Sequence, residues 1–524
     1  MSFSGHLLRL TSYLFIFTLL FPSCTRRTER IPGFLYLRLS SDITTLDPAM
    51  IVDVSGGAVS ARIFNGLVRF DEESKVIPDL ADSYSISRDG KRYRFSLRKG
   101  VRFHNGREFT AKDVKYSFER VLNPNTRSPR TWLFDRILGA REFMNGASPD
   151  VRGIRVLNDY TVEIEITEPF GPFLNLLAMP SACIVPSDEA VKEGFSSNPV
   201  GTGPFTVKEW KRGRELILSA SEDYFDKRPK IKGIVYRVIP EELTAIAEFE
   251  SGNLDVIGVP STEFRRYSES PKWSGLIMKS SGLNTFYLGL NCQRPPFDDK
   301  RVRQALNYAI DRERILGTIL EGRAELAAGS IPPLLLKGGN KGYGYDPEKA
   351  RALLKEAGLE KGFGFRIYQG VDQDTADIME VVQQYLKEIG VDAEIVQLEW
   401  SAFKDAINKG EADSFWLSWK ADYPDPENFL FPVFHSSNWG AAGNRARFKD
   451  PHIDKIIEDA QREPDEEKRK ALYLEAERMT IEEAPWVFFW HKNDYTIYQP
   501  WVDGIKAYPI YNADKGTDVA VVKF

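Results

Sequence analysis

Asp422 is the residue whose position most strongly suggests chemistry. It lies three residues beyond a short, mostly apolar run, FWLSW at 415–419, whose side chains alternate as in a largely buried strand. Pro424 and Pro426 follow and interrupt any regular ladder. A carboxylate at the end of such a strand can neutralise a cationic group of a ligand. It can instead bond its own backbone in a turn, which is a common use of Asp.

Signatures of the common enzyme classes are missing from the sequence. It contains no G-x-S-x-G, H-E-x-x-H, C-x-x-C or phosphate-loop motif, and GTGPF at 201–205 indicates only a turn before a strand. Two histidines never stand together at ligand spacing; the five are His6, His104, His435, His452 and His491. We therefore predict a binding protein without a resident metal or other cofactor, and not an enzyme.

Helices and strands alternate from about residue 298 and place Asp422 at a sheet edge. Asp346 before Pro347 predicts a helix start, and the apolar stripe between residues 378 and 389 predicts a helix that ends at Gly390. A strand through 395–398 and a helix from Ser401 then lead into the strand at 415–419. This alternation predicts a mostly parallel sheet with helices on its faces. Ligands bind outside the carboxyl ends of such strands, where Asp422 falls.

The first third of the chain reads differently, as hairpins with an occasional helix. Asp89-Gly90 predicts a hairpin turn, and YTVEIEIT at 160–167 alternates like a half-exposed strand. Thr110 with Asp113 predicts a capping box at the start of an amphipathic helix.

The N-terminus predicts export. Residues 1–23 hold an apolar run of about ten residues, too short to span a membrane but typical of a signal peptide. Cys24 follows a small residue, as in a bacterial lipobox, so we expect lipidation there, a tether at 24–34 and no other membrane anchor. Plain secretion, with Cys24 a bystander, is the alternative.

The charge and the cysteine content of the chain exclude two classes of protein. The net charge of −5 lacks the basic excess of a nucleic-acid binder. The other cysteines, Cys183 and Cys292, are too few for a disulfide-built fold. They could form one bridge or be two buried small hydrophobes, and we favour the second.

Several long stretches resemble the bacterial extracellular solute-binding proteins of family 5, the peptide- and nickel-binding lipoproteins of ABC importers. These are LDPAMIVDVSGGAVSARIFNGLVRF, PDLADSYSISRDGKRYRFSLRKGVRFHNGREFTAKDVKYSFERVLNP, NPVGTGPFTVKEW, NTFYLGLNCQRPPFDDKRVRQALNYAIDRERIL and DYPDPENF. The resemblance implies an α/β fold, a two-lobed periplasmic-binding-protein clamshell of type II in the large peptide-binding class. It implies lobe I at 35–284 plus 493–524, with an extra N-terminal subdomain at about 65–190, and lobe II at 285–492.

The resemblance also implies roles for particular residues. In the family's peptide binders an aspartate of a W-x-x-D segment holds the ligand's α-ammonium group, and that position is Asp422 here. Trp419 and Trp400 match aromatic positions that line side-chain pockets. The segment 51–57 matches a loop whose main chain runs beside the peptide, with Val54 as the expected contact.

Two positions depart from the oligopeptide-binding pattern. Lys420 stands where a half-cystine can stand, and Arg130 stands where a pocket tyrosine can stand. Lys420 could be a solvated or rim charge or a receptor for a ligand carboxylate, and we favour the first.

These features predict that the protein is a monomeric lipoprotein in the periplasm or at the cell surface of a bacterium. It would capture short peptides between its lobes and deliver them to ABC permease subunits served by a cytoplasmic ATPase. Three alternatives stay open: an oligosaccharide as ligand, a nickel chelate as ligand, or a peptide receptor that signals instead of importing. The aromatic content of 12% keeps the sugar alternative in view, although a sugar has no ammonium group for Asp422 to neutralise.

Overall fold

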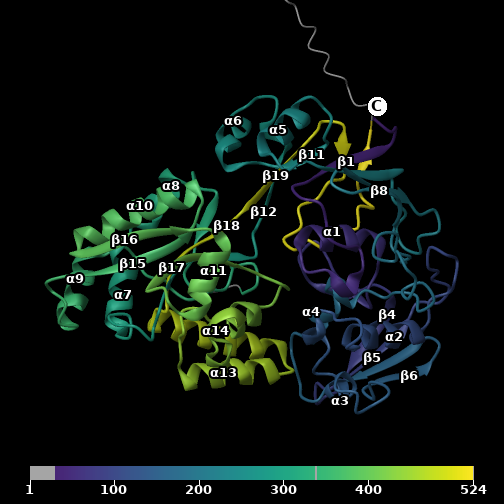
Figure 1. Cartoon of the computed structure of the whole chain (residues 1–524), viewed down its shortest axis with the longest axis horizontal. Coiled ribbons are helices and arrows are strands. Elements are labelled where there is room, and N and C mark those ends of the chain that lie inside the picture. Colours follow the sequence, from purple (N-terminus) through teal and green to yellow (C-terminus); the bar gives the residue numbers. More distant parts are fainter. Residues whose placement is uncertain (1–29, 337–338, 523–524) are drawn as a thin grey trace, which may run out of the picture.

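Two lobes, each built on a mixed sheet, make up the protein (Figure 1). The structure is a computed structural model that describes residues 30–336 and 339–522, so the predicted signal peptide and Cys24 lie outside the described residues. We call the part with the seven-stranded sheet lobe I and the part with the six-stranded sheet lobe II.

The sheet of lobe I joins the two ends of the chain. Within the described residues its order is β12 (Ile277–Ser280), β19 (Asp494–Tyr498), β11 (Val256–Gly258), β1 (Phe34–Leu39), β10 (Gly233–Val238), β9 (Glu215–Ala220) and β8 (Phe205–Lys211). Among these described strands only the β1–β10 and β1–β11 pairs are parallel, and the other pairs are antiparallel. Because β19 comes from near the C-terminus, lobe I is discontinuous in sequence.

The sheet of lobe II corrects one prediction. Its described strands lie in the order β14 (Ala324–Leu326), β18 (Trp486–Lys492), β13 (Asn284–Leu290), β17 (Ser414–Lys420), β15 (Phe363–Gly370) and β16 (Val391–Leu398). Only the β15–β16 and β15–β17 pairs are parallel, and the other three are antiparallel. The expectation of a mostly parallel sheet is therefore wrong, because β13 enters from lobe I and β18 leads back to it without crossover helices, and both strands pair antiparallel with their neighbours.

Helices cover both faces of this sheet. The set α7 (Lys300–Ala309), α8 (Arg312–Thr318), α9 (Pro347–Glu356) and α10 (Gln373–Glu388) packs against the face that bears Trp416. The set α11 (Trp400–Lys409), α13 (Pro451–Arg462) and α14 (Glu466–Glu483) packs against the face that bears Leu417. The predicted helix start at Asp346 is confirmed, since its side chain accepts the Lys349 N–H at 2.9 Å.

A four-stranded antiparallel sheet lies at the far end of lobe I, in the blue part of Figure 1. Its strands are β4 (Ala81–Ile86), β5 (Arg92–Leu97), β7 (Thr161–Glu165) and β6 (Ile154–Asn158), with α2 (Ala111–Leu122) packed beside them. The predicted hairpin is confirmed by the β4–β5 pairing, with Gly90 at φ +68°, and the capping box of Thr110 and Asp113 is present.

Shorter elements complete the lobes. In lobe I these are α1 (Val54–Ile63), α3 (Ala140–Met144), α4 (Phe173–Leu177), α5 (Glu242–Glu250), α6 (Phe264–Ser268) and the two-stranded sheets β2 (Val68–Phe70) with β3 (Val76–Pro78) and β20 (Val502–Asp503) with β21 (Ala520–Val521). Lobe II adds α12 (Phe431–Phe434). Among the described helices none is long and apolar enough to cross a membrane.

The chain passes between the two large sheets twice. One passage is residues 281–283, between β12 and β13, and the other is Asn493, between β18 and β19. The attachment to lobe I begins at Arg30, within the tether expected at 24–34, because Arg30 donates to the Gly252 carbonyl and the Asp255 carboxylate, both at 2.6 Å.

The cysteines of the described chain are not bonded to each other. Cys292 is buried and Cys183 is half-buried, and both thiols are free. Burial raises the pKa of Cys292 to about 11, which keeps this thiol protonated at neutral pH. Of the two alternatives left by the sequence, the unbridged one is therefore confirmed.

Candidate functional site

Asp422 lies where the sheet of lobe II meets lobe I. The predicted strand is confirmed as β17, and its last residue, Lys420, pairs with Asn284, the first residue of β13 after the passage from lobe I. The Ala421 N–H donates to the Leu283 carbonyl in that passage at 2.9 Å. The carboxyl ends of the parallel strands of lobe II therefore point toward lobe I, and Asp422 stands at that edge.

The carboxylate of Asp422 has no protein partner within the described residues. Only its backbone N–H is engaged, donating to Asn428 Oδ1 at 3.0 Å, so the side chain does not stabilise its own turn. Asp422 is half-buried, and this burial raises the pKa of its carboxyl, while the Arg130 guanidinium acts in the opposite direction. A partly desolvated carboxylate without a donor is unfavourable, and a ligand cation would relieve it.

The two lobes touch again just beyond Asp422. The Asp425 carboxylate accepts a hydrogen bond from Asn175 of lobe I at 3.1 Å, and the Tyr423 ring lies 6.5 Å from the Trp132 ring. Asp425 also accepts the Glu427 N–H at 2.9 Å and thereby caps the short helical turn Pro426–Phe429. Asp422 thus stands between a chain passage on one side and a contact between lobes on the other.

Arg130 reaches this place from lobe I. Its guanidinium donates to the carbonyls of Ile51 and Val52, both at 3.1 Å, and thereby fixes the chain just before α1. Tyr511 lies within electrostatic reach of both Arg130 and Asp422, and burial raises the pKa of Tyr511 to about 12. The structure therefore brings the predicted residues Asp422 and Arg130 together, and Tyr511 is an addition that the sequence did not indicate.

The segment 51–57 is not the continuous loop expected from the sequence. Residues 51–53 are extended or irregular, but α1 begins at Val54, and Asp53 caps it by accepting the Gly56 N–H at 2.6 Å. The carbonyls of a helix accept hydrogen bonds from N–H groups of the same helix. Strand-like pairing with a ligand is therefore limited to residues 51–53. Val54 itself is 47% exposed at the first turn of α1.

Trp419 and Lys420 lie on opposite faces of β17. Trp419 packs against the same core cluster as Leu417, and its indole nitrogen is buried without an acceptor in the described chain. Lys420 is exposed and lines a cavity of about 350 Å³ with Arg323, Lys492 and other residues. Because strand side chains alternate, Lys420 cannot share a pocket wall with Trp419.

Trp400 is the first residue of α11 and is 57% exposed. Its ring lies beside Gly370, the last residue of β15, which places it at the same carboxyl-end edge as Asp422. One turn further along α11, the Lys404 ammonium lies 5.5 Å from the centroid of the Trp400 ring.

Two cations, Lys404 beside Trp400 and Arg445 near Lys404, were missed by sequence reasoning. Burial and the nearby Arg445 guanidinium lower the pKa of Lys404 to about 8. Burial also lowers the pKa of Arg445. Only the position of Lys404, four residues after Trp400 on a predicted helix, could have pointed to it.

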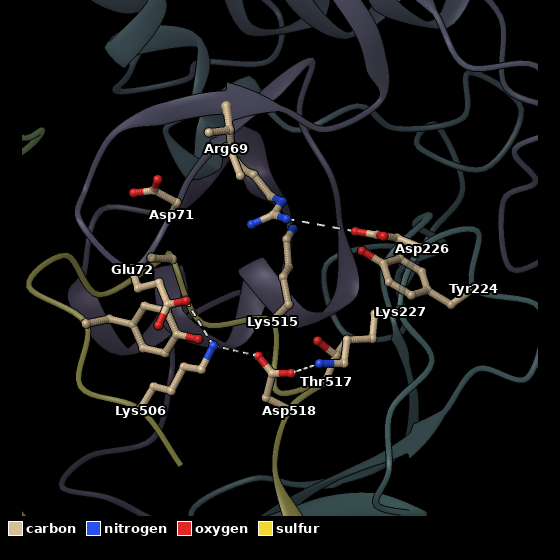
Figure 2. Close-up of a pocket in the computed structure, with 13 residues that line it drawn as sticks. Arg69, Asp71, Glu72, Tyr224, Asp226, Lys227, Lys506, Lys515, Thr517 and Asp518 are labelled. Atoms are coloured by element: carbon tan, nitrogen blue, oxygen red, sulfur yellow. Dashed lines mark hydrogen bonds and ion pairs between the residues drawn. The ribbon is translucent and has the colours of Figure 1, made fainter. Parts of the chain in front are cut away.

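A charged cavity of about 270 Å³ in lobe I gives a useful contrast (Figure 2). Its charges neutralise one another: Lys506 pairs with Glu72 at 2.9 Å and with Asp518 at 3.2 Å, Lys227 pairs with Asp518, and Arg69 lies 3.9 Å from Asp226. None of the residues predicted for ligand binding lines this cavity. The described residues also contain no group of His, Cys, Asp or Glu arranged to hold a metal ion.

Comparison with known proteins agrees with this geometry. A model of the bacterial extracellular solute-binding proteins, family 5, matches residues 75–441. The heme-binding protein A of Haemophilus influenzae is 32% identical over 500 residues, covering 90% of each chain. The dipeptide-binding protein of Escherichia coli is 30% identical over 478 residues, covering 86% of this chain and 87% of that protein.

A solved structure extends the match to the whole fold. It is the ABC transporter-associated periplasmic binding protein DppA of Helicobacter pylori in complex with the peptide STSA, which is 29% identical to this chain. The two superpose with a TM-score of 0.76, covering 94% of this chain and 98% of that one.

Proposed function

The chain belongs to family 5 of the bacterial extracellular solute-binding proteins, and on this premise we propose that it binds short peptides between its lobes and delivers them to an ABC permease. The family consists of solute-binding proteins and not of enzymes, so we propose binding and release without catalysis. The peptide bound to the Helicobacter pylori protein supports this choice of ligand class.

One observation carries the proposal, namely the unpartnered carboxylate of Asp422 between the lobes. A peptide's α-ammonium group is the cation that would pair with it, in a setting where little water screens the interaction. Trp419 and Trp400 would line the side-chain pockets, and Arg130 would hold the segment 51–53 in place beside the ligand.

The ligand's main chain would form hydrogen bonds with the extended residues 51–53, much as an added strand does. Such bonds do not depend on the identity of the ligand's side chains. Val54, at the exposed first turn of α1, would contact the ligand through its side chain. Bridging water would let the pockets accept varied residues. We therefore propose loosely specified peptides as the preferred ligands.

Native mass spectrometry of the protein as purified tests the ligand class. Co-purified peptides of mixed mass would support the proposal. One discrete sugar, nickel chelate or tetrapyrrole would contradict it, and the last is included because a relative is named a heme-binding protein. A neutral sugar, a nickel chelate and a tetrapyrrole offer no free ammonium group to pair with Asp422.

The remaining parts of the proposal concern movement and location. We propose that residues 35–284 with 493–524 move as lobe I, including the subdomain at 65–190, and that 285–492 move as lobe II. We also propose a monomer anchored through a lipid on Cys24 outside the cytoplasm. The resemblance and the N-terminal sequence support the anchor, and a neighbouring permease gene would favour import over signalling.

A further inference from the structure

Lys404 and Arg445 of lobe II are cations without an anionic partner in the described chain. Arg445 is only 8% exposed, and its guanidinium donates to Asn408 Oδ1 at 2.9 Å and to the Gly443 carbonyl at 3.3 Å. Asn408 lies one turn after Lys404 on α11, so the two cations share one side of that helix. The neighbouring acid, Asp405, pairs instead with Lys409 at 2.6 Å.

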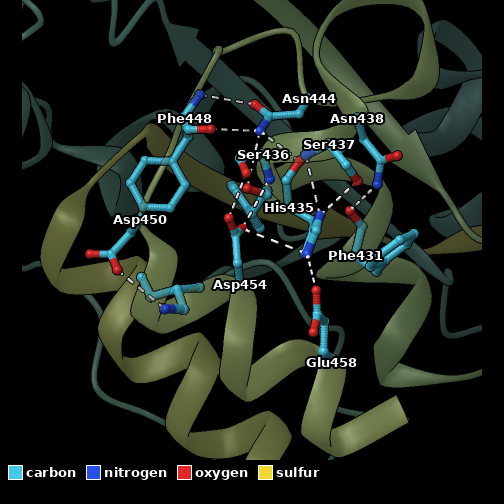
Figure 3. Close-up of polar contacts among 12 residues, drawn as sticks. Phe431, His435, Ser436, Ser437, Asn438, Asn444, Phe448, Asp450, Asp454 and Glu458 are labelled. Carbon is cyan, nitrogen blue, oxygen red and sulfur yellow. Dashed lines mark hydrogen bonds and ion pairs between the residues drawn. The ribbon is translucent and has the colours of Figure 1, made fainter. Parts of the chain in front are cut away.

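The loop that carries Arg445 is held firmly (Figure 3). The Asn444 amide donates to the carbonyls of Phe434 at 3.0 Å and Phe448 at 2.9 Å, and its oxygen accepts the Phe448 N–H at 3.0 Å. The Ser436 N–H and hydroxyl both donate to Asp454 of α13, at 2.9 and 2.5 Å. These bonds fix the backbone beside Arg445, and the hydrogen bonds to Asn408 and Gly443 hold its guanidinium.

Two more polar groups on the same face of lobe II lack partners in the described chain. One is the hydroxyl of Tyr287, which is fully buried and lies within electrostatic reach of Arg445. The other is the indole N–H of Trp419. Tyr287 pairs with Leu417 across β13 and β17, so it shares a sheet face with Trp419. Phe403 of α11 packs in the same cluster, and Lys404 is the next residue of this helix.

Leaving two neighbouring cations partly buried and unpaired is unfavourable, because each loses hydration and each repels the other. Burial and the repulsion from Arg445 accordingly lower the pKa of Lys404. In the cavity of Figure 2, by contrast, Lys227 and Lys506 are both paired with acids of the chain. The missing anion near Lys404 is thus expected from outside the chain.

We propose that Lys404 and Arg445 form a subsite for a carboxylate of the bound ligand. This inference rests on the proposed function, because it presumes a peptide between the lobes with its ammonium group at Asp422. The carboxylate has two possible sources, an Asp or Glu side chain of the peptide or its C-terminal carboxylate. Both present the planar pair of oxygens that a guanidinium binds well.

The experiment incubates the protein, after its own ligand is removed by refolding, with a random library of tri- to pentapeptides and identifies the bound peptides by mass spectrometry. A second library carries C-terminal amides. Wild type is compared with Lys404→Gln and Arg445→Gln. Lys420→Gln is the matched control, since it removes the same charge from the opposite face of β17.

An acidic side chain as the source predicts at least tenfold enrichment of Asp and Glu over Asn and Gln at one peptide position. A C-terminal carboxylate as the source predicts at least tenfold poorer recovery of the amidated library. In either case Lys404→Gln and Arg445→Gln should abolish the preference, and Lys420→Gln should keep it.

Two outcomes would overturn the inference, and they differ. If wild type binds peptides but shows neither preference, or if the variants retain it, the subsite does not exist. If wild type retains no peptide from either library, the proposed function itself fails. Arg445 is buried and its variant could misfold, so thermal melts accompany each protein, and Lys404→Gln, which removes no hydrogen bond found in the described chain, decides the question by itself.

Discussion

Asp422→Asn should abolish the recognition of a peptide's free N-terminus while leaving the fold intact. The change keeps the shape of the side chain and removes its charge. Because the carboxylate accepts no hydrogen bond within the described chain, folding loses no contact. Burial disfavours its ionised form, so the melting temperature should stay the same or rise slightly.

The size of the effect on binding follows from the surroundings of Asp422. Two unit charges 4 Å apart interact by about 4 kcal/mol at an effective dielectric constant of about 20. Truncating one partner of a buried charge pair typically costs about 2–5 kcal/mol. Arg130 already offsets part of the negative charge of Asp422, so we expect about 2–4 kcal/mol, roughly a thirtyfold to several-hundredfold loss of affinity.

Calorimetry with one good peptide, its N-acetylated form and both proteins measures this effect directly. Acetylation removes the ammonium group, so the acetylated peptide should bind wild type as poorly as the free peptide binds the variant. Asp372→Asn is the matched control, because Asp372 caps α10 by accepting the Thr375 N–H at 2.9 Å and Asn caps a helix equally well. If wild type binds the acetylated peptide as tightly as the free one, Asp422 does not hold the N-terminus.

Three other predictions concern movement, pH and anchoring. Saturating peptide should lower the radius of gyration measured by small-angle scattering, since the lobes would close about residues 281–283 and 493; an unchanged radius argues against closure. Burial raises the pKa of Glu427 from 4.5 to about 7, so the folded state binds a proton that the unfolded state releases, and the free energy of unfolding falls as pH rises across that window. Glu427→Gln should flatten this decline in thermal melts between pH 4.5 and 7.5, and an equally steep decline refutes the assignment. Cys24→Ser should release the protein from membranes, and retention after a salt wash would count against a lipid anchor.

The sequence predicted an element correctly where that element is determined by residues close to it in the chain. The capping box at Thr110, the hairpin at Gly90 and the strand before Asp422 depend on neighbours a few residues away, and all three are confirmed. The direction of the lobe II strands depends instead on partners more than a hundred residues apart. No local pattern shows that β13 enters from lobe I and that β18 leads back to it, so the parallel sheet was predicted wrongly.

The same distinction explains what was missed at the site. Strand alternation alone already separates Trp419 from Lys420, and the structure places them on opposite faces of β17. Lys404 and Arg445, by contrast, come from a helix and a separate loop. Each looks like an ordinary surface charge in the sequence, and only the fold shows that no acid of the described chain pairs with either of them.

Lobe II carries a negative charge on Asp422 and positive charges on Lys404 and Arg445. Asp422 pairs with neither of these cations. Asp422 is fixed just past β17 by the bonds of Ala421 and Asn428, and Arg445 is held by the network around Asn444. Rigid elements thus keep the charges apart at a cost to the free protein, which a ligand with an ammonium group and a carboxylate would relieve at both ends. An uncharged sugar would relieve neither, so charge placement, more than aromatic content, favours a zwitterionic peptide.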